Sequence, residues 1–216
     1  MDPNQEIQKA SLPKLISWWA GENLPDWATA TALLHEKVAS ALRRVGPNGI
    51  RFLKTQIESG DLRKRAVALR ALSNKETCDD EVVSFLIDAF RVSSGLERQA
   101  ADGFKELAMN SLINIEQYPL DRSEVEPLLE HRDKYLAATA MVYLSHAVPD
   151  ETIGILRSGL RHANPIRRGY ACTQAGFRNI HQLKHEVSDL LKDSDQFVSR
   201  SARIACEMFD LVSART

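Results

Sequence analysis

The sequence predicts an all-α protein, an α-α superhelix in which about five helical hairpins stack behind an N-terminal capping hairpin. Three observations lead to this fold class. Apolar residues recur at spacings of three and four, and runs of alternating polarity, which are typical of half-buried strands, do not occur. One pattern of helix-packing residues occurs five times, at intervals of 30 to 40 residues. Turn and capping residues separate these repeats.

We expect residues 1–46 to form capping helices. A short helix precedes a long amphipathic helix over residues 26–45. Trp18, Trp19 and Trp27 cluster here, where the apolar end of a stack has to be closed, and covering that end is the favoured role for them. Two adjacent tryptophans on one helix cannot both face the same core, so a binding platform for a partner is the alternative.

Residues 47–216 carry the five repeats. In the second helix of each repeat, an opening apolar residue is followed by a packing residue at four and another at seven, as in Leu62, Ala66 and Leu69. The openers are Leu62, Leu96, Leu136, Ile166 and Val198. A hairpin with two apolar sides cannot bury both by itself, so neighbouring hairpins have to stack around a continuous core. We therefore assign residues 1–216 to a single domain.

An apolar first helix precedes each opener, over residues 50–57, 82–90, 125–129, 153–160 and 187–191. The residues between helices agree with this division. Asn164 before Pro165 is typical of an N-cap followed by proline in the first turn. Ser123 and Glu126 match a capping box. Residues 47–49 and 93–95 have the composition of turns.

The stretch over residues 190–202, Leu-Leu-Lys-Asp-Ser-Asp-Gln-Phe-Val-Ser-Arg-Ser-Ala, resembles the turn and second helix of a HEAT repeat. Ile166-Arg167 resembles the Val-Arg pair of that motif as well. The period is closer to the short HEAT-like repeats of phycobiliprotein lyases than to the longer classical unit, and Arg200 lies one position beyond the usual register. The resemblance covers about residues 48–212 and implies a solenoid whose second helices line a concave face.

Arginines on the predicted second helices are the candidate partner-binding residues. The resemblance implies that they share the concave face, and guanidinium groups suit carboxylates or phosphates. The candidates are Arg63, Arg65, Arg70, Arg167, Arg168, Arg178, Arg200 and Arg203. Pairing within the protein is the alternative, because cations in the first turn of a helix oppose its dipole and need compensation.

Two other features invite a functional interpretation. Residues 110–122 exceed what a hairpin link requires, which is typical of a functional connection, although Leu112, Ile113 and Ile115 would equally extend the preceding helix into the core. His181 and His185 are four residues apart and would share a helix face, but a third ligand at a fixed spacing is missing. We therefore expect neither a metal site nor a cofactor.

Composition limits the classes of partner and compartment. The net charge of −1 gives no overall attraction to nucleic acid or anionic membranes, although residues 41–75 hold nine basic and two acidic residues and residues 76–133 five basic and fourteen acidic. Cys78, Cys172 and Cys206 are far apart and fit thiols in a reducing compartment. Because neither a secretory signal nor a membrane-spanning run occurs, we expect a cytoplasmic protein.

These observations favour a non-enzymatic interaction module that binds a protein or an acidic peptide segment on its concave face, as a scaffold, adaptor or inhibitor. We expect a monomer or a weak homo-oligomer. No nucleophile elbow, catalytic cysteine signature or phosphate-binding glycine loop occurs. The alternatives are a HEAT-like glycosylase acting on DNA lesions and a lyase or chaperone similar to the phycobiliprotein lyases. Nucleic acid is not the expected partner, because the acidic central segment would repel a phosphate backbone.

Overall fold

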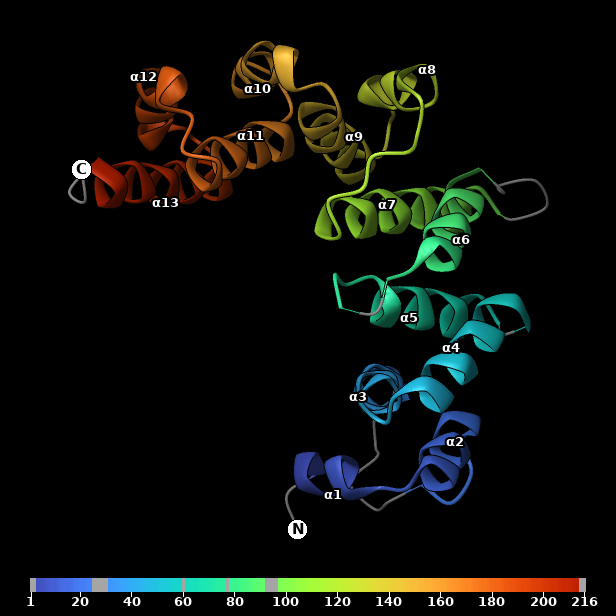
Figure 1. The fold of residues 1–216 in the computed structure, drawn as a ribbon. Coiled ribbons are helices and arrows are strands. Elements are labelled where there is room, and N and C mark those ends of the chain that lie inside the picture. Colours follow the sequence, from blue (N-terminus) through green and yellow to red (C-terminus); the bar gives the residue numbers. More distant parts are fainter. Residues whose placement is uncertain (1–2, 25–30, 60, 77, 92–96, 214–216) are drawn as a thin grey trace. The chain divides into compact units, whose positions relative to one another are not determined.

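The computed structural model describes residues 3–24, 31–59, 61–76, 78–91 and 97–213. Every regular element in these ranges is a helix, as the sequence predicts (Figure 1). None of the helices in the described ranges combines the length and apolarity needed to cross a lipid bilayer. Trp27, the opener Leu96 and the predicted turn at residues 93–95 lie outside the described residues.

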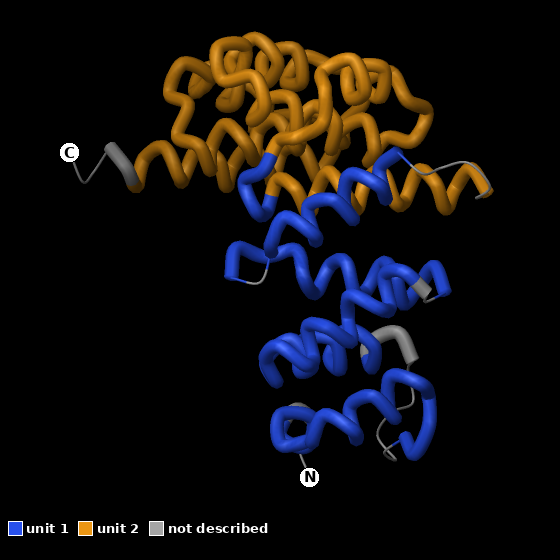
Figure 2. The backbone as a smooth tube through the Cα atoms, turned by 45° about the vertical axis from the view of Figure 1, so that its right-hand side comes forward, with its two compact units in different colours: residues 1–92, 114–117 blue, residues 93–113, 118–216 orange. Residues whose placement is uncertain are grey.

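The chain divides into two compact units (Figure 2). Unit 1 comprises residues 1–92 and 114–117, and unit 2 comprises residues 93–113 and 118–216. The expected boundary between capping helices and hairpins, at residues 46 and 47, coincides with the link between two helices of unit 1. The assignment of the whole chain to one domain stays a prediction.

Unit 1 is built from six helices in its described part: α1 (Pro3–Lys9), α2 (Leu12–Ala20), α3 (Thr31–Arg44), α4 (Pro47–Ser59), α5 (Leu62–Leu72) and α6 (Asp80–Arg91). Helix α3 packs against α2, α4 and α5. Trp18 and Trp19 of α2 are both buried, and the Trp19 indole donates a hydrogen bond to Oε1 of Gln56 at 2.9 Å. Both tryptophans therefore close the interior of this unit, which agrees with the favoured role.

Unit 2 follows with α7 (Arg98–Asn114), α8 (Arg122–Val125), η1 (Glu126–Glu130), α9 (Lys134–Ala147), η2 (Pro149–Glu151), α10 (Thr152–Leu160), α11 (Pro165–Phe177), η3 (His181–Leu183), α12 (Lys184–Asp189), η4 (Leu190–Lys192) and α13 (Gln196–Ser213). Helix α11 packs between α9 and α13, and α10 covers α9 and α11. Figure 1 shows α8, α10 and α12 on one side of the row formed by α9, α11 and α13.

The caps of α9, α11 and α13 recur with a spacing of 31 residues. Asp133, Asn164 and Asp195 each accept a hydrogen bond from the backbone N–H two residues later, at 2.9, 2.9 and 2.8 Å. The residue two positions before each cap, His131, His162 or Asp193, accepts the N–H of the capping residue itself. This arrangement supplies the unpaired amides of a helix start with acceptors, and it is the same at the starts of α9, α11 and α13.

The structure corrects two of the predicted opening residues. The predicted opener Ile166 is one position too early, because Arg167 is the residue that lies 31 positions after the buried Leu136 and 31 before the buried Val198. The predicted opener Leu62 is also wrong as a packing residue, since it is 39% exposed at the first position of α5. The sequence pattern depends only on the spacing of residues along one helix, whereas burial depends on how that helix is rotated against its neighbours.

Two predicted helix starts are displaced. The capping box is formed by Asp121 and Glu124 rather than by Ser123 and Glu126, and the Glu124 carboxylate accepts the Asp121 N–H at 3.0 Å. Residues 47–49 form the first turn of α4 instead of a free turn, with Gly49 placed directly against the backbone of Leu42. The predicted cap at Asn164, with Pro165 at the first helical position, is confirmed.

Candidate functional site

Arg167 is committed to the interior of unit 2. Its side chain is 6% exposed, and Nη1 donates to the carbonyl oxygen of Leu129 at 2.8 Å. The same nitrogen lies 2.9 Å from Nε2 of His162, and burial together with this guanidinium lowers the pKa of His162. Arg167 thus fills a core position with a hydrogen-bonded cation, and it presents almost no surface to a partner.

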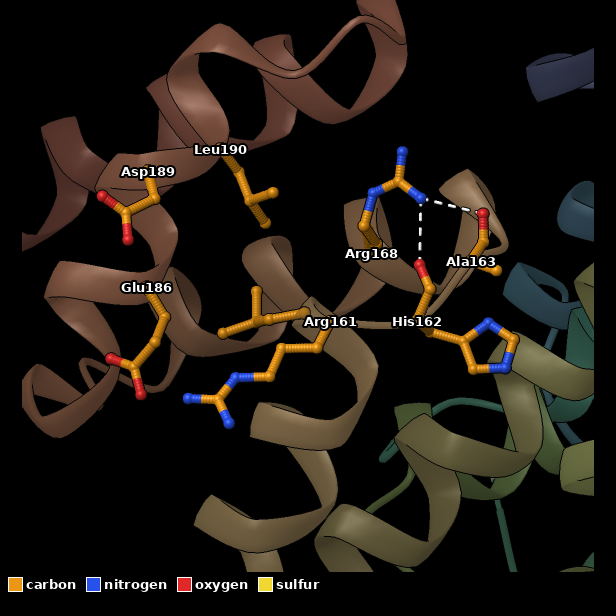
Figure 3. A pocket seen from close by; sticks show the side chains of 8 residues that line it. Arg161, His162, Ala163, Arg168, Glu186, Asp189 and Leu190 are labelled. Carbon is orange, nitrogen blue, oxygen red and sulfur yellow. Dashed lines mark hydrogen bonds between the residues drawn. The ribbon is translucent and has the colours of Figure 1, made fainter.

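Arg168 and Arg178 are also engaged within unit 2. Arg168 forms a bidentate pair with Asp193 and donates through Nη1 to the carbonyl oxygens of His162 and Ala163, both at 2.9 Å (Figure 3). Arg178 donates to the carbonyl oxygen of Ser145 at 2.9 Å, and burial lowers the pKa of its guanidinium. For these arginines the geometry favours the internal-pairing alternative.

The three candidate arginines of unit 1 lie on α5. Arg63 is exposed and Arg65 is partly buried. Arg70 pairs with Glu36 of α3, with Nη1 and Oε1 2.9 Å apart, and both side chains are at least half exposed. An exposed pair of this kind contributes little to stability because solvent screens it, so Arg70 remains accessible to a competing carboxylate.

Arg200 and Arg203 differ from the other candidates of unit 2. Both are exposed on α13, and neither forms an ion pair or a hydrogen bond through its side chain to any part of the chain that the structure describes. Among the candidate arginines of this unit, they are accordingly the two that the described structure leaves for a partner.

An exposed apolar stripe runs along the same helix, and sequence reasoning missed it. Phe197, Ile204 and Leu211 of α13 are 41%, 40% and 62% exposed. Residues seven apart lie on one side of a helix, so these three side chains form a line, with Arg200 between the first two. The seven-residue spacing was visible in the sequence, but it was indistinguishable there from a core-facing pattern.

Helix α11 extends this stripe sideways. The ring centroids of Tyr170 and Phe197 are 6.3 Å apart. The Phe197 ring also packs directly on Gly169, where the side chain of any larger residue would collide with it. Phe177, seven residues after Tyr170 and therefore on the same side of α11, is 67% exposed. We define the α11–α13 face as the surface formed by Tyr170, Phe177, Phe197, Arg200, Ile204 and Leu211.

A separate hollow of about 550 Å³ lies between the end of α10, the start of α11 and α12 (Figure 3). Its lining mixes charges of both signs, including Arg161, Arg168, Glu186 and Asp189. Arg168 is already bound to Asp193, and Glu186 accepts a hydrogen bond from Arg157 at 2.7 Å, which lowers the pKa of the Glu186 carboxyl. Arg161 and Asp189 add one charge of each sign, so the lining has no net charge that would select for an anion or a cation.

No protein-family model matches the chain, and no curated protein is significantly similar to it. The arrangement of the residues themselves therefore has to carry the functional argument.

The two remaining candidates from the sequence are the histidine pair, His181 and His185, and the long connection over residues 110–122. The His181 ring packs on Phe209 with centroids 5.5 Å apart, while His185 is exposed beside Asp189 at 4.0 Å. No group of three metal-ligating side chains occurs in the described ranges. In the long connection, α7 continues to Asn114 and buries Leu112, as the helix-extension alternative predicts.

Proposed function

We propose that this protein is a non-enzymatic interaction module that binds a protein partner through the α11–α13 face. In this proposal the helices of unit 2 form a HEAT-like solenoid, and the long helices α9, α11 and α13 supply its binding side. The 31-residue spacing of the caps supports the repeat, because identical starts place successive helices in equivalent positions.

The observation that carries the proposal is the clustering of large exposed apolar side chains on two adjacent helices. Single exposed apolar residues are normal on any protein surface, whereas contiguous ones mark interaction sites. Phe177, Phe197, Ile204 and Leu211 belong to helices that pack directly on each other, and the Tyr170 ring bridges toward Phe197. Aromatic residues with an arginine at their centre have the composition of interface hot spots.

The chemistry of the face specifies the kind of partner. Apolar side chains seven residues apart accept the apolar side of an amphipathic helix, which packs its own residues into the gaps between them. Arg200 lies in this line and calls for a carboxylate on the partner. We therefore narrow the expected acidic segment to a helix that presents a carboxylate beside its apolar side, and we assign the recognition of that carboxylate to Arg200. The free cysteines Cys78, Cys172 and Cys206 support a cytoplasmic location.

Capture from native lysate tests the proposal with matched variants. Tagged wild-type protein, Ile204→Asp and Leu191→Asp are compared after cross-linking, with the captured chains identified by mass spectrometry. Leu191 lies on η4 outside the α11–α13 face and is 41% exposed, close to the 40% of Ile204, so it controls for adding a surface charge. We expect Ile204→Asp to lose a captured chain that wild type and Leu191→Asp retain. Equal capture by all three proteins would disprove binding through this face.

A further inference from the structure

The exposed side of α13 is self-complementary. Its residues follow one another at alternating spacings of three and four, in the order Phe197, Arg200, Ile204, Glu207 and Leu211. These residues are all exposed and lie on one side of the helix. The order has an apolar residue at each end, an apolar residue in the middle, and opposite charges at the two positions between them.

We infer that the occupant of this face is α13 of a second copy of the chain, packed antiparallel about a two-fold axis at Ile204. This inference rests on the proposed function and names its partner. In an antiparallel pair, Phe197 of one copy faces Leu211 of the other, and Arg200 faces Glu207. The same two contacts occur again on the other side of the axis, as in every isologous interface.

The charges select this orientation over a parallel one. Arg200 and Glu207 form no ion pair through their side chains within the described residues, so both are available across an interface. A parallel pair would place Arg200 against Arg200 and Glu207 against Glu207, and like charges in contact disfavour that arrangement. The antiparallel pair forms two complementary contacts from the same residues.

The charged residues on the other sides of α13 limit the interface to the side that carries Phe197, Ile204 and Leu211. Asp210, on another side of the helix, is engaged by Lys184 at 2.8 Å. Arg203 is exposed but lies outside the line of seven-residue spacings, which makes it a suitable control. A single pair of helices of this length, about 27 Å, buries less surface than a standard protein interface of roughly 1,600 Å². We therefore expect a weak dimer.

Sedimentation velocity over a protein concentration from about 1 µM to about 1 mM tests the inference. Either single variant, Arg200→Glu or Glu207→Arg, places two residues of the same charge opposite each other across the interface. We expect each variant to weaken dimerisation by at least about tenfold. The double variant Arg200→Glu/Glu207→Arg restores both opposite-charge contacts and should dimerise like wild type. A mixture of wild type and double variant should form no mixed dimer. Arg203→Glu should leave the dimer unchanged, and circular dichroism should show equal helix content throughout.

Wild-type protein that remains monomeric up to the highest concentration overturns the inference. A dimer that is insensitive to the single reversals, or that the double reversal fails to restore, overturns it as well. The inference can fail while the proposed function stands: if the chain is monomeric yet Ile204→Asp abolishes capture of another protein, the face binds that protein and not a second copy. A monomer with equal capture by all variants removes both proposals.

Discussion

Arg168 and Asp193 form a bidentate ion pair, with Nε and Oδ2 2.8 Å apart and Nη2 and Oδ1 2.9 Å apart. The side chains are only 16% and 9% exposed. Asp193 also accepts the N–H of Asp195 at 2.9 Å, at the start of α13. One carboxylate thus joins α11 to the cap of the helix that carries the exposed stripe.

Asp193→Asn should destabilise unit 2 by about 1–3 kcal/mol, because it leaves a largely buried guanidinium without its counter-charge. The Arg168 guanidinium lowers the pKa of the Asp193 carboxyl below its usual 3.8. The ionised form is therefore favoured in the folded state, and its stabilisation is fully present above that value and is lost as pH falls through the lower folded pKa. Urea unfolding at a series of acidic pH values should show this loss in wild type and a smaller one in Asp193→Asn.

Arg167→Ala and Arg200→Ala should separate internal pairing from surface exposure. The first leaves the Leu129 carbonyl without its donor and opens a gap in the core, so we expect a loss of about 2–3 kcal/mol. Arg167→Leu should cost less, since the buried Leu136 occupies the corresponding position at the start of α9. Arg200→Ala should change stability by less than about 0.5 kcal/mol. Thermal unfolding measures all three, and an unchanged Arg167→Ala would contradict the structural role.

Gly176→Ala should destabilise the contact between α11 and α13. A methyl group at Gly176 would lie 2.6 Å from Cα of Ala205, and the two backbones would have to separate, at a cost of roughly 1–3 kcal/mol. The matched control is Gly103→Ala in the middle of α7, where the added methyl group has no heavy atom within 4 Å. That change should stabilise by up to about 1 kcal/mol through helix propensity. Equal effects of the two substitutions on the melting temperature would refute the close approach.

Unit 1 should lose stability on mild acidification through His35. This residue is 8% exposed, and its Nε2 donates to the carbonyl oxygen of Trp19 at 3.2 Å, so the neutral ring carries its proton there. Burial lowers the pKa of His35 below 6.5. The unfolded chain therefore takes up a proton more readily, and stability should fall as pH drops below 6.5.

Tryptophan fluorescence makes this measurement specific, because Trp18, Trp19 and Trp27 all belong to residues 1–92 of unit 1. Urea midpoints followed by fluorescence should decrease between neutral pH and about pH 5.5 in wild type. His35→Gln retains a donor for the Trp19 carbonyl and cannot titrate in this range, so its midpoint should vary less. A variant as sensitive as wild type would show that another group is responsible.

The positions of most helices could be predicted from the sequence. The predicted first helices at residues 50–57, 82–90 and 153–160 correspond to α4, α6 and α10, and the cap at Asn164 is where it was expected. The start of the α8 helix was misplaced because Asp121 and Ser123 are both acceptable caps, and only the hydrogen bond between Asp121 and Glu124 distinguishes them.

The candidate site was less predictable. The eight arginines looked equivalent because each was assigned to a predicted second helix, yet Arg167 binds Leu129 and Arg168 binds Asp193, which are 38 and 25 residues away. A pattern of neighbouring residues in the sequence cannot indicate which distant residue a side chain will contact. The apolar spacing of Phe197, Ile204 and Leu211 was visible, but a stripe that faces solvent has the same period as one that faces the core.

The sequence by itself determined the all-helical class and the positions of most helices, because helix periodicity and capping depend on residues within a few positions of each other. Only the tertiary structure decided which cations are used inside the protein and which side of α13 faces solvent. The physical reason is that burial and ion pairing depend on the rotation and packing of whole helices. Residues far apart in the chain meet at those contacts, as Arg168 meets Asp193.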